Sequence, residues 1–141
     1  MINKAIAIAN KAHTGQLDKG GEAYILHPLR VMMAFDNEEE RICGLLHDVV
    51  EDSTITFDDL RAEGFSKSVL AALDCLTKKT GEDYETFIDR VLTNELACRV
   101  KLADLADNMD SSRLTELTDK DRQRLKKYQL AADKIKNRLK G

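Results

Sequence analysis

The run from Leu45 to Asp52 carries the residues best suited to chemistry, because one histidine and three acidic side chains interrupt an apolar segment there. On a helix, residues four apart share a face, so His47 is expected beside Glu51. Asp48 is likewise expected beside Asp52. Carboxylates this close repel one another, by roughly 0.2–0.5 kcal/mol per exposed pair and by more when buried. A cation would relieve that repulsion, so the run predicts a divalent metal held by imidazole and carboxylate groups.

Two more histidines bear on this prediction. His27 directly precedes Pro28 at the start of the helix expected before that of His47, so an antiparallel helix pair would bring both imidazoles to one metal. The alternative for His27 is a structural histidine beside a proline. His13 is expected at the C-terminal end of the first helix, where the helix dipole favours a partly cationic ring. A structural role, or one at the substrate's edge, is favoured there over metal ligation.

A second polar cluster lies later in the chain. Asp104 and Asn108 are four apart and share a face that is flanked by apolar residues. A buried carboxylate needs a metal or a counter-charge, so Asp104 is predicted as a metal ligand or, alternatively, as the partner of an internal cation such as Lys101. Asp107 and Asp110 fall on other faces and are expected to meet solvent.

The two clusters together supply two imidazoles and two carboxylates, namely His27, His47, Asp48 and Asp104. Such a mixed nitrogen and oxygen set suits Mn²⁺, Fe²⁺ or Zn²⁺ and leaves coordination positions open for water and substrate. The metal would acidify a water molecule and polarise a phosphoryl oxygen. Glu51 and Asp52 remain to orient or deprotonate that water.

The elements that must position these residues are helices. Apolar residues recur at helical spacing along the whole chain, alternating patterns are absent, and there is one proline. Thr56, Ser66 and Thr118 are predicted N-caps, and Gly64 a helix stop. We expect an all-α fold of about six to eight helices in a single compact domain spanning residues 1–141. Its helices are expected near residues 2–13, from 28, 38–51, 57–63, from 67, 83–92, 94–110 and from 119.

Composition narrows the class of protein. The 141 residues are 43% hydrophobic and 33% charged, which is typical of a globular chain. No run approaches the roughly 20 apolar residues of a membrane helix, and the N-terminus lacks a signal-peptide core, so cytoplasmic residence without membrane attachment is expected. The cysteines lack Cys-x-x-Cys spacing and are interpreted as small core residues in a reducing compartment. They are Cys43, Cys75 and Cys98.

Charge is unevenly distributed along the chain. The net charge is −3, but residues 119–141 carry nine Lys and Arg against three Asp, a net +6 that leaves −9 for residues 1–118. An acidic body is consistent with a metal site. The basic C-terminal segment is interpreted as a solvated helix face or, alternatively, as a surface for an anionic partner. An acidic chain with few aromatic residues argues against a dedicated nucleic-acid binder.

Three motifs in a fixed order resemble a known family: His27-Pro28, then His47-Asp48-Val49-Val50-Glu51-Asp52, then Lys101-Leu102-Ala103-Asp104 with Asn108. They resemble the HD superfamily of metal-dependent phosphohydrolases. More specifically, they are similar to the hydrolase domain of the RelA/SpoT alarmone enzymes and to the small stand-alone alarmone hydrolases. The resemblance runs from about Ala12 to Arg113, and the ordered set is far more specific than a lone His-Asp pair.

The resemblance implies a ligand set, usually for Mn²⁺, at His27, His47, Asp48 and Asp104. It also implies a catalytic pair at Glu51 and Asp52 and substrate contacts at Lys19 and Asn108. The implied reaction removes pyrophosphate from the ribose 3′ position of guanosine tetra- or pentaphosphate (ppGpp or pppGpp), in a hydrolase-only, stand-alone form. Two alternatives stay open: a nucleotidase or phosphatase acting on another nucleotide, and a non-catalytic nucleotide-sensing module. The oligomeric state is not predicted.

The departures from the family pattern concern the nucleobase rather than the metal. Asp18 stands where the family commonly has an arginine associated with the base, and an aspartate cannot stack as a guanidinium does. Ala23 replaces an expected proline, and the usual Arg-Leu-His after Asp104 is Leu-Ala-Asp here. Lys19 remains available for a phosphate, or is an ordinary loop lysine. Tyr24 is expected to pack against His27 rather than to line the pocket.

Overall fold

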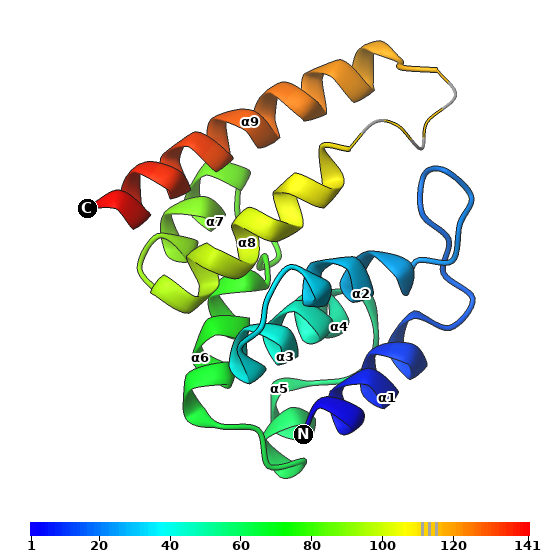
Figure 1. Ribbon diagram of the computed structural model, residues 1–141, viewed down its shortest axis with the longest axis vertical. Helices are drawn as coiled ribbons and strands as arrows, with labels where there is room; N and C mark the ends of the chain where they lie inside the picture. The colour runs from blue at the N-terminus through cyan, green and yellow to red at the C-terminus, as the bar shows by residue number, and fades with distance from the viewer. Residues whose placement is uncertain (111, 113, 115) are drawn as a thin grey trace.

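The computed structural model describes residues 1–110, 112, 114 and 116–141, and over these residues the chain forms nine α-helices and no strand (Figure 1). Arg113, where the sequence resemblance was placed to end, lies outside the described residues. The helices are α1 (Ile2–His13), α2 (Leu26–Met33), α3 (Glu38–Leu46), α4 (Val49–Asp52), α5 (Phe57–Ala62), α6 (Lys67–Leu76), α7 (Tyr84–Val91), α8 (Glu95–Asn108) and α9 (Asp119–Lys140). The all-α prediction is therefore confirmed.

Helix starts follow the capping residues that the sequence offers. The side chains of Thr56, Ser66 and Thr118 each accept a hydrogen bond from a backbone N–H of the first helical turn, as predicted. Capping satisfies backbone donors that have no partner within the helix and stabilises it by about 1 kcal/mol. Gly64 follows α5 with φ of +92°, a conformation that favours glycine, so the predicted stop is also confirmed.

The prediction of a single helix over residues 38–51 was wrong. α3 ends at Leu46, His47 and Asp48 form a turn, and α4 begins at Val49. Asp48 has φ of −106° and ψ of −1°, at the edge of the right-handed helical region, and the helix is interrupted just where the two polar side chains occur. Apolar residues occupy both sides of the break, so the periodicity continues across it and does not reveal it. This extra helix takes the count above the six to eight expected.

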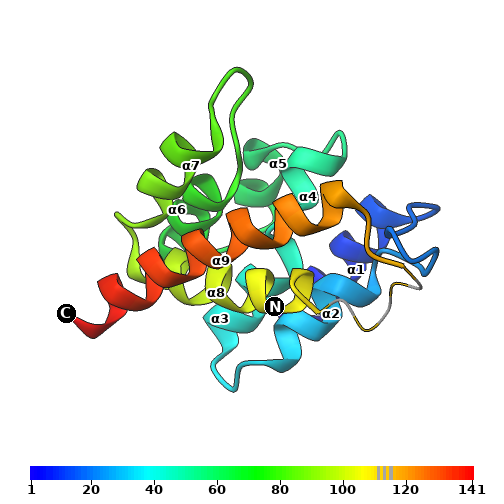
Figure 2. The same cartoon turned by 90° about the horizontal axis from the view of Figure 1, so that it is seen from above.

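α3 packs against α1, α2, α6 and α8, which surround it in the view of Figure 1. Its C-terminal half is apolar and fully buried, with Leu45 and Leu46 among the largest enclosed side chains. α9 lies along α8 and crosses over the centre of the fold in the view of Figure 2. The helices that carry the polar clusters, α2, α3 and α8, therefore pack against one another.

Gly44 allows α2 and α3 to approach closely. A Cβ atom built on Gly44 would lie 3.2 Å from the Met32 backbone nitrogen and 3.2 Å from Val31 Cγ1, which is tighter than ordinary packing. The missing side chain therefore lets the backbone of α2 rest on α3. This contact brings His27, near the start of α2, within reach of His47 at the end of α3.

The basic C-terminal segment is one long helix with a narrow buried stripe. α9 buries Ala131, Ala132 and Ile135, and most of its charged side chains face outward. Within the described ranges, no helix combines the length and the apolar composition that crossing a lipid bilayer requires. All three cysteines are described and are free thiols; Cys43 and Cys98 are buried as expected, whereas Cys75 is half-buried.

Candidate metal centre

Three parts of the fold bring four side chains to one point. His27 comes from α2, His47 and Asp48 from the turn after α3, and Asp104 from α8, and one ligand atom of each lies within 4.8 Å of the others. Asp104 Oδ1 lies 2.8 Å from His27 Nε2 and 3.1 Å from His47 Nε2. Asp48 Oδ2 lies 3.0 Å from His47 Nε2. The four candidate ligands named from the sequence are thus brought together.

Both imidazoles present Nε2 to this point because their other nitrogen is already bonded. His27 Nδ1 lies 2.6 Å from Asp107 Oδ2, and His47 Nδ1 lies 2.6 Å from the carbonyl oxygen of Gly44. A carbonyl or ionised carboxylate oxygen can only accept, so each Nδ1 carries a hydrogen and donates it. The two Nε2 atoms lie 3.2 Å apart and face the carboxylates of Asp48 and Asp104, and when deprotonated they would offer lone pairs to a cation. Together with two carboxylate oxygens, this arrangement attracts a cation.

The spacing of the donor atoms fits a transition-metal ion. With metal–ligand bonds of about 2.1 Å, ligands at right angles lie about 3 Å apart. The separations that involve an imidazole Nε2 run from 2.8 Å between His27 Nε2 and Asp104 Oδ1 to 3.7 Å between His27 Nε2 and Asp48 Oδ2, and all four ligand atoms lie within 4.8 Å of one another. Two nitrogen and two oxygen donors are the set expected for Mn²⁺, Fe²⁺ or Zn²⁺ rather than for Ca²⁺ or Mg²⁺.

Asp104 also serves as the partner of a buried cation. Its Oδ2 lies 2.8 Å from Lys101 Nζ, while its Oδ1 faces the histidines and accepts a 3.1 Å hydrogen bond from Asn108 Nδ2. Burial by itself would raise the pKa of Asp104, but Lys101 and His47 outweigh it and hold that pKa well below its usual range. The two interpretations of Asp104 from sequence are therefore compatible, because each uses a different oxygen atom.

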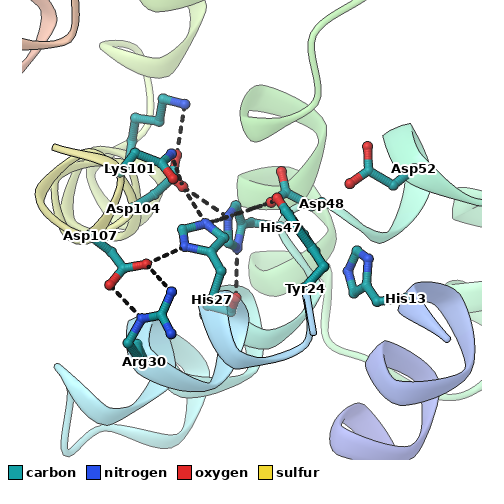
Figure 3. A network of polar contacts seen from close by, with 12 residues as sticks. His13, Tyr24, His27, Arg30, His47, Asp48, Asp52, Lys101, Asp104 and Asp107 are labelled. Carbon is teal, nitrogen blue, oxygen red and sulfur yellow. Dashed lines mark hydrogen bonds and ion pairs between the residues drawn. The ribbon is translucent and has the colours of Figure 1, made fainter. Parts of the chain in front are cut away.

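Asp107 is largely buried, so the prediction that it faces solvent was wrong. Its side chain is 12% exposed. It accepts a hydrogen bond from His27 and two more from Arg30, from Nε at 2.7 Å and from Nη2 at 3.1 Å. Burial opposes its charge, but the bonds from His27 and Arg30 lower the pKa of Asp107 to about 2. The signal was present in the sequence, because residues three apart on a helix, such as Asp104 and Asp107, also share a face. Figure 3 shows this group beside the imidazoles.

Tyr24 both packs against a histidine and bonds to an acid. Its ring centroid lies 5.6 Å from that of His27, as expected, and its hydroxyl also donates to Asp48 Oδ2 at 2.5 Å. Burial and the Asp48 carboxylate raise the pKa of Tyr24, so the phenol keeps its proton. The sequence analysis missed this hydrogen bond.

Glu51 and Asp52 extend from α4, one turn beyond the cluster. Glu51 Oε1 accepts from the backbone N–H of Lys78 at 3.1 Å, and Asp52 Oδ2 accepts from Gln16 Nε2 at 3.2 Å. Burial, followed by the nearby Asp48 carboxylate, raises the pKa of Glu51. Burial and Asp48 also raise the pKa of Asp52, although the bond from Gln16 works against them. A raised pKa makes a carboxylate a stronger base near neutral pH.

Two cavities adjoin the cluster and share some of their lining. One, of about 330 Å³, is bordered by Lys19, Arg30 and Arg124. The other, of about 480 Å³, is bordered by Glu51 and by three lysines. Residues lining both are Tyr24, Asn108 and Tyr128, so the prediction that Tyr24 would pack against His27 instead of lining the pocket was wrong in its second part. Partial burial and the nearby Arg124 lower the pKa of Lys19, which is the effect expected where cations gather around a site for an anion.

The loop that carries Lys19 is shaped by Asp18. Asp18 Oδ1 accepts from the backbone N–H groups of Gly20 and Glu22, each at 2.9 Å. An aspartate side chain commonly organises a turn in this way. The departure from the family's arginine at this position therefore replaces a stacking group with a residue that organises the loop.

No family model matches this chain. The GTP pyrophosphokinase of Myxococcus xanthus is 33% identical over 127 residues, which cover 77% of the chain and 17% of that protein. The bifunctional (p)ppGpp synthase/hydrolase SpoT of Escherichia coli K12 is 32% identical over 124 residues, which cover 77% of the chain and 17% of that protein. The guanosine-3′,5′-bis(diphosphate) 3′-pyrophosphohydrolase of Aquifex aeolicus is 31% identical over 119 residues, which cover 78% of the chain and 17% of that protein. The chain thus spans 17% of the length of these relatives.

A solved structure shows the same fold over nearly the whole chain. It is that of a metazoan ortholog of SpoT, described as hydrolyzing ppGpp and acting in starvation responses, and it matches with a TM-score of 0.76 and 24% identity. The match covers 99% of this chain and 85% of the other. At this identity the likeness shows the fold. Together with the sequence relatives, it confirms the resemblance that the three motifs indicated.

Proposed function

We propose, from the homology of this chain to the RelA/SpoT alarmone enzymes, that it is a metal-dependent phosphohydrolase that removes the 3′-pyrophosphate of ppGpp or a related nucleotide. One observation carries the proposal: His27, His47, Asp48 and Asp104 converge from three parts of the fold with Glu51 and Asp52 one turn away. The printed activities of the relatives supply the reaction. We further propose that residues 1–141 act as one domain.

The four converging residues would hold the metal, and we propose Mn²⁺ because the donor set mixes imidazole with carboxylate. When bound, such an ion supplies an acidified water molecule and neutralises charge on a phosphoryl oxygen. The protein's part is to keep the donors in place. Asp107 and the Gly44 carbonyl hold the two imidazoles, and Tyr24 holds Asp48.

Glu51 and Asp52 would accept the proton of the attacking water. Each has one oxygen fixed by a hydrogen bond from a residue outside α4, which orients the carboxylate. Their raised pKa values favour proton uptake near neutral pH. General-base catalysis of this kind contributes roughly 10²–10⁴-fold to the rate.

The paired cavities support a nucleotide as the substrate class. A bis(diphosphate) nucleotide carries phosphates on both sides of its ribose, and the two cavities meet at Asn108, which is bonded to Asp104. Lys19 borders the first cavity and would contact a phosphate there. Asn108 would contact the substrate between the two cavities.

A specific observation also favours a second candidate, hydrolysis of a different nucleotide. Asp18 Oδ1 accepts hydrogen bonds from Gly20 and Glu22 within the loop, and an aspartate offers no guanidinium to stack on a guanine. The metal-centred chemistry would be unchanged, but the preferred base or phosphate pattern would differ. Product analysis distinguishes the two candidates.

The decisive experiment is product analysis with a panel of 3′-pyrophosphorylated guanine and adenine nucleotides, with and without added Mn²⁺. Release of pyrophosphate from ppGpp supports the first candidate. Pyrophosphate from other nucleotides, or orthophosphate, supports the second. Thermal stabilisation by nucleotide without any turnover would contradict both and indicate a sensing module.

Variants of the two bases test the mechanism. Glu51→Gln and Asp52→Asn should each lower turnover by roughly 10²–10⁴-fold while metal content stays the same. Asp48→Ala is the contrasting variant, because it should lose the metal, which elemental analysis of the purified protein would show. Unchanged turnover in both base variants would exclude Glu51 and Asp52 from the reaction.

A further inference from the structure

His13, at the end of α1, is a buried histidine outside the metal cluster. His13 is 2% exposed, and its Nδ1 lies 2.8 Å from Oε1 of Gln16. An amide oxygen only accepts, so Nδ1 carries the hydrogen in this bond. Nε2 of His13 is buried without a hydrogen-bond partner in the described part of the chain. A hydrogen on Nε2 would therefore be a buried donor without an acceptor, which also favours the form protonated on Nδ1.

Gln16 connects this histidine to Asp52. Its Nε2 lies 3.2 Å from Asp52 Oδ2, and a carboxylate accepts, so the NH₂ end of the amide must face the acid. The Oε1 end then faces His13, as the bond to Nδ1 requires. His13 and Asp52 thus fix the same orientation of the Gln16 amide. If one of these two hydrogen bonds is removed, the other becomes weaker.

The backbone of Gln16 is held as firmly as its side chain. Its N–H donates to the carbonyl oxygen of His13 at 3.0 Å, and its carbonyl oxygen accepts from the N–H of Tyr24 at 2.8 Å. The ring of Tyr24 lies 4.9 Å from that of His13, and its hydroxyl reaches Asp48. Figure 3 shows His13 and Asp52 side by side, next to Tyr24. The loop after α1 is thereby joined to both the metal cluster and Asp52.

The bond from Gln16 leaves the other half of the Asp52 carboxylate available. Within the described ranges, Oδ1 of Asp52 accepts no protein hydrogen bond, whereas Oδ2 is occupied by Gln16. A carboxylate held by one oxygen keeps the second in a fixed direction, and orientation of this kind governs proton-transfer rates. The acid therefore has one oxygen for positioning and one for water.

We propose that Gln16 and His13 are positioning residues that fix Asp52 for deprotonation of the attacking water, Gln16 directly and His13 by orienting the Gln16 amide. This inference rests on the proposed function, because it assumes that Asp52 handles that water. This role explains why Gln16, in a glycine-rich loop, faces Asp52, which lies 36 positions later in the chain.

The test is a double-mutant cycle between Gln16 and Asp52, read as kcat and KM for pyrophosphate release with Mn²⁺ present. Gln16→Ala should lower kcat by roughly 10- to 100-fold, with KM and metal content unchanged, because misorientation of a reacting group costs rates of this order. In the Asp52→Asn background, Gln16→Ala should have no further effect. Gln123→Ala, at an exposed position of α9, is the matched control and should leave kcat unchanged.

His13 is tested by a graded pair of variants. His13→Ala should approach the kcat of Gln16→Ala, whereas His13→Asn keeps an N–H near the place of Nδ1 and should recover most of the rate. If His13→Ala proves unstable, Gln16→Asn tests the bridge itself, because its shorter amide cannot reach both His13 and Asp52.

The failures are distinguishable. Normal turnover in Asp52→Asn would exclude Asp52 from the proposed mechanism and overturn this inference with it. A slow Asp52→Asn together with an unaffected Gln16→Ala would overturn the inference alone. Equal losses from Gln16→Ala in the wild-type and Asp52→Asn backgrounds would also overturn it, since Gln16 would then act through another group.

Discussion

The two histidines of the candidate metal centre are held in different ways. His47 donates from Nδ1 to the carbonyl oxygen of Gly44, three residues earlier in the same segment. His27 donates from Nδ1 to the carboxylate of Asp107, 80 residues later in α8, and Arg30 in turn holds Asp107. One histidine is oriented by its own helix end, and the other by side chains that only the tertiary structure brings together.

This difference has a chemical consequence. A carboxylate partner makes the imidazole more basic and a stronger metal ligand, whereas a neutral carbonyl mainly orients the ring. The donor strength of His27 therefore depends on side chains that substitution can remove. The donor strength of His47 depends on the position of the Gly44 carbonyl, a backbone group that a side-chain substitution changes only indirectly. Changes near the two histidines should thus have different sizes and different signatures.

The largest effect is expected where the two histidines meet, at Asp104. Asp104→Ala removes the oxygen that faces both imidazoles and leaves the Lys101 ammonium buried without its partner. The protein should lose its metal, and its free energy of unfolding should fall by about 3–5 kcal/mol, as for other broken buried pairs. Elemental analysis and denaturant titration measure these two quantities.

A second substitution separates these two losses. Adding Lys101→Met to Asp104→Ala removes the unpaired charge, so stability should recover while metal content does not. Full metal content in the single Asp104→Ala variant would exclude Asp104 as a required metal ligand.

Asp107→Asn tests the side-chain-held histidine directly. Loss of the carboxylate that orients His27 should weaken metal affinity about 10- to 100-fold, since outer partners of metal-bound histidines have effects of this size. Competition with a chelating dye measures the affinity. Asp89→Asn, an equal change of charge at an exposed position of α7, should leave it unchanged. Unaltered affinity in Asp107→Asn would mean that His27 needs a charged partner no more than His47 does.

Gly44→Ala tests the close backbone contact between α3 and α2. The added Cβ would lie 3.2 Å from the Met32 nitrogen and 3.3 Å from Met32 Cα, so α2 must shift on α3. Overpacking costs about 1–3 kcal/mol, partly offset by the roughly 0.5–1 kcal/mol that alanine gains over glycine in a helix. The net loss of unfolding free energy should be modest and accompanied by weaker metal binding, because α2 carries His27. A more stable protein with unchanged metal affinity would refute the close-contact argument.

The contrast also separates what the sequence could predict from what it could not. Caps at Thr56, Ser66 and Thr118 act on backbone groups within three residues, so local pattern was sufficient to place them. The break at His47 and Asp48 was missed, because buried apolar residues continue on both sides and the backbone angles that make the break leave no trace in periodicity.

In the site, the four converging residues His27, His47, Asp48 and Asp104 could be named because their types and spacing are unusual inside apolar helices. Asp107 was missed because an acid near a helix end normally meets solvent, and its partner His27 is 80 residues away. Gln16 was missed because an uncharged residue in a loop has no periodic neighbours. Pairings between distant segments depend on packing, and here the contact between α2 and α8 creates the pairing of His27 with Asp107.

The smallest effect is expected one bond further from the metal, at Arg30. Its Nε and Nη2 reach the two oxygens of Asp107 at 2.7 and 3.1 Å, a paired geometry that a lysine cannot reproduce. Arg30→Lys keeps the charge and leaves Asp107 bonded to His27, so metal affinity should fall only about threefold, equivalent to under about 1 kcal/mol. The same dye competition measures it. A loss as large as that of Asp107→Asn would show that the guanidinium, rather than the carboxylate, determines how His27 is held.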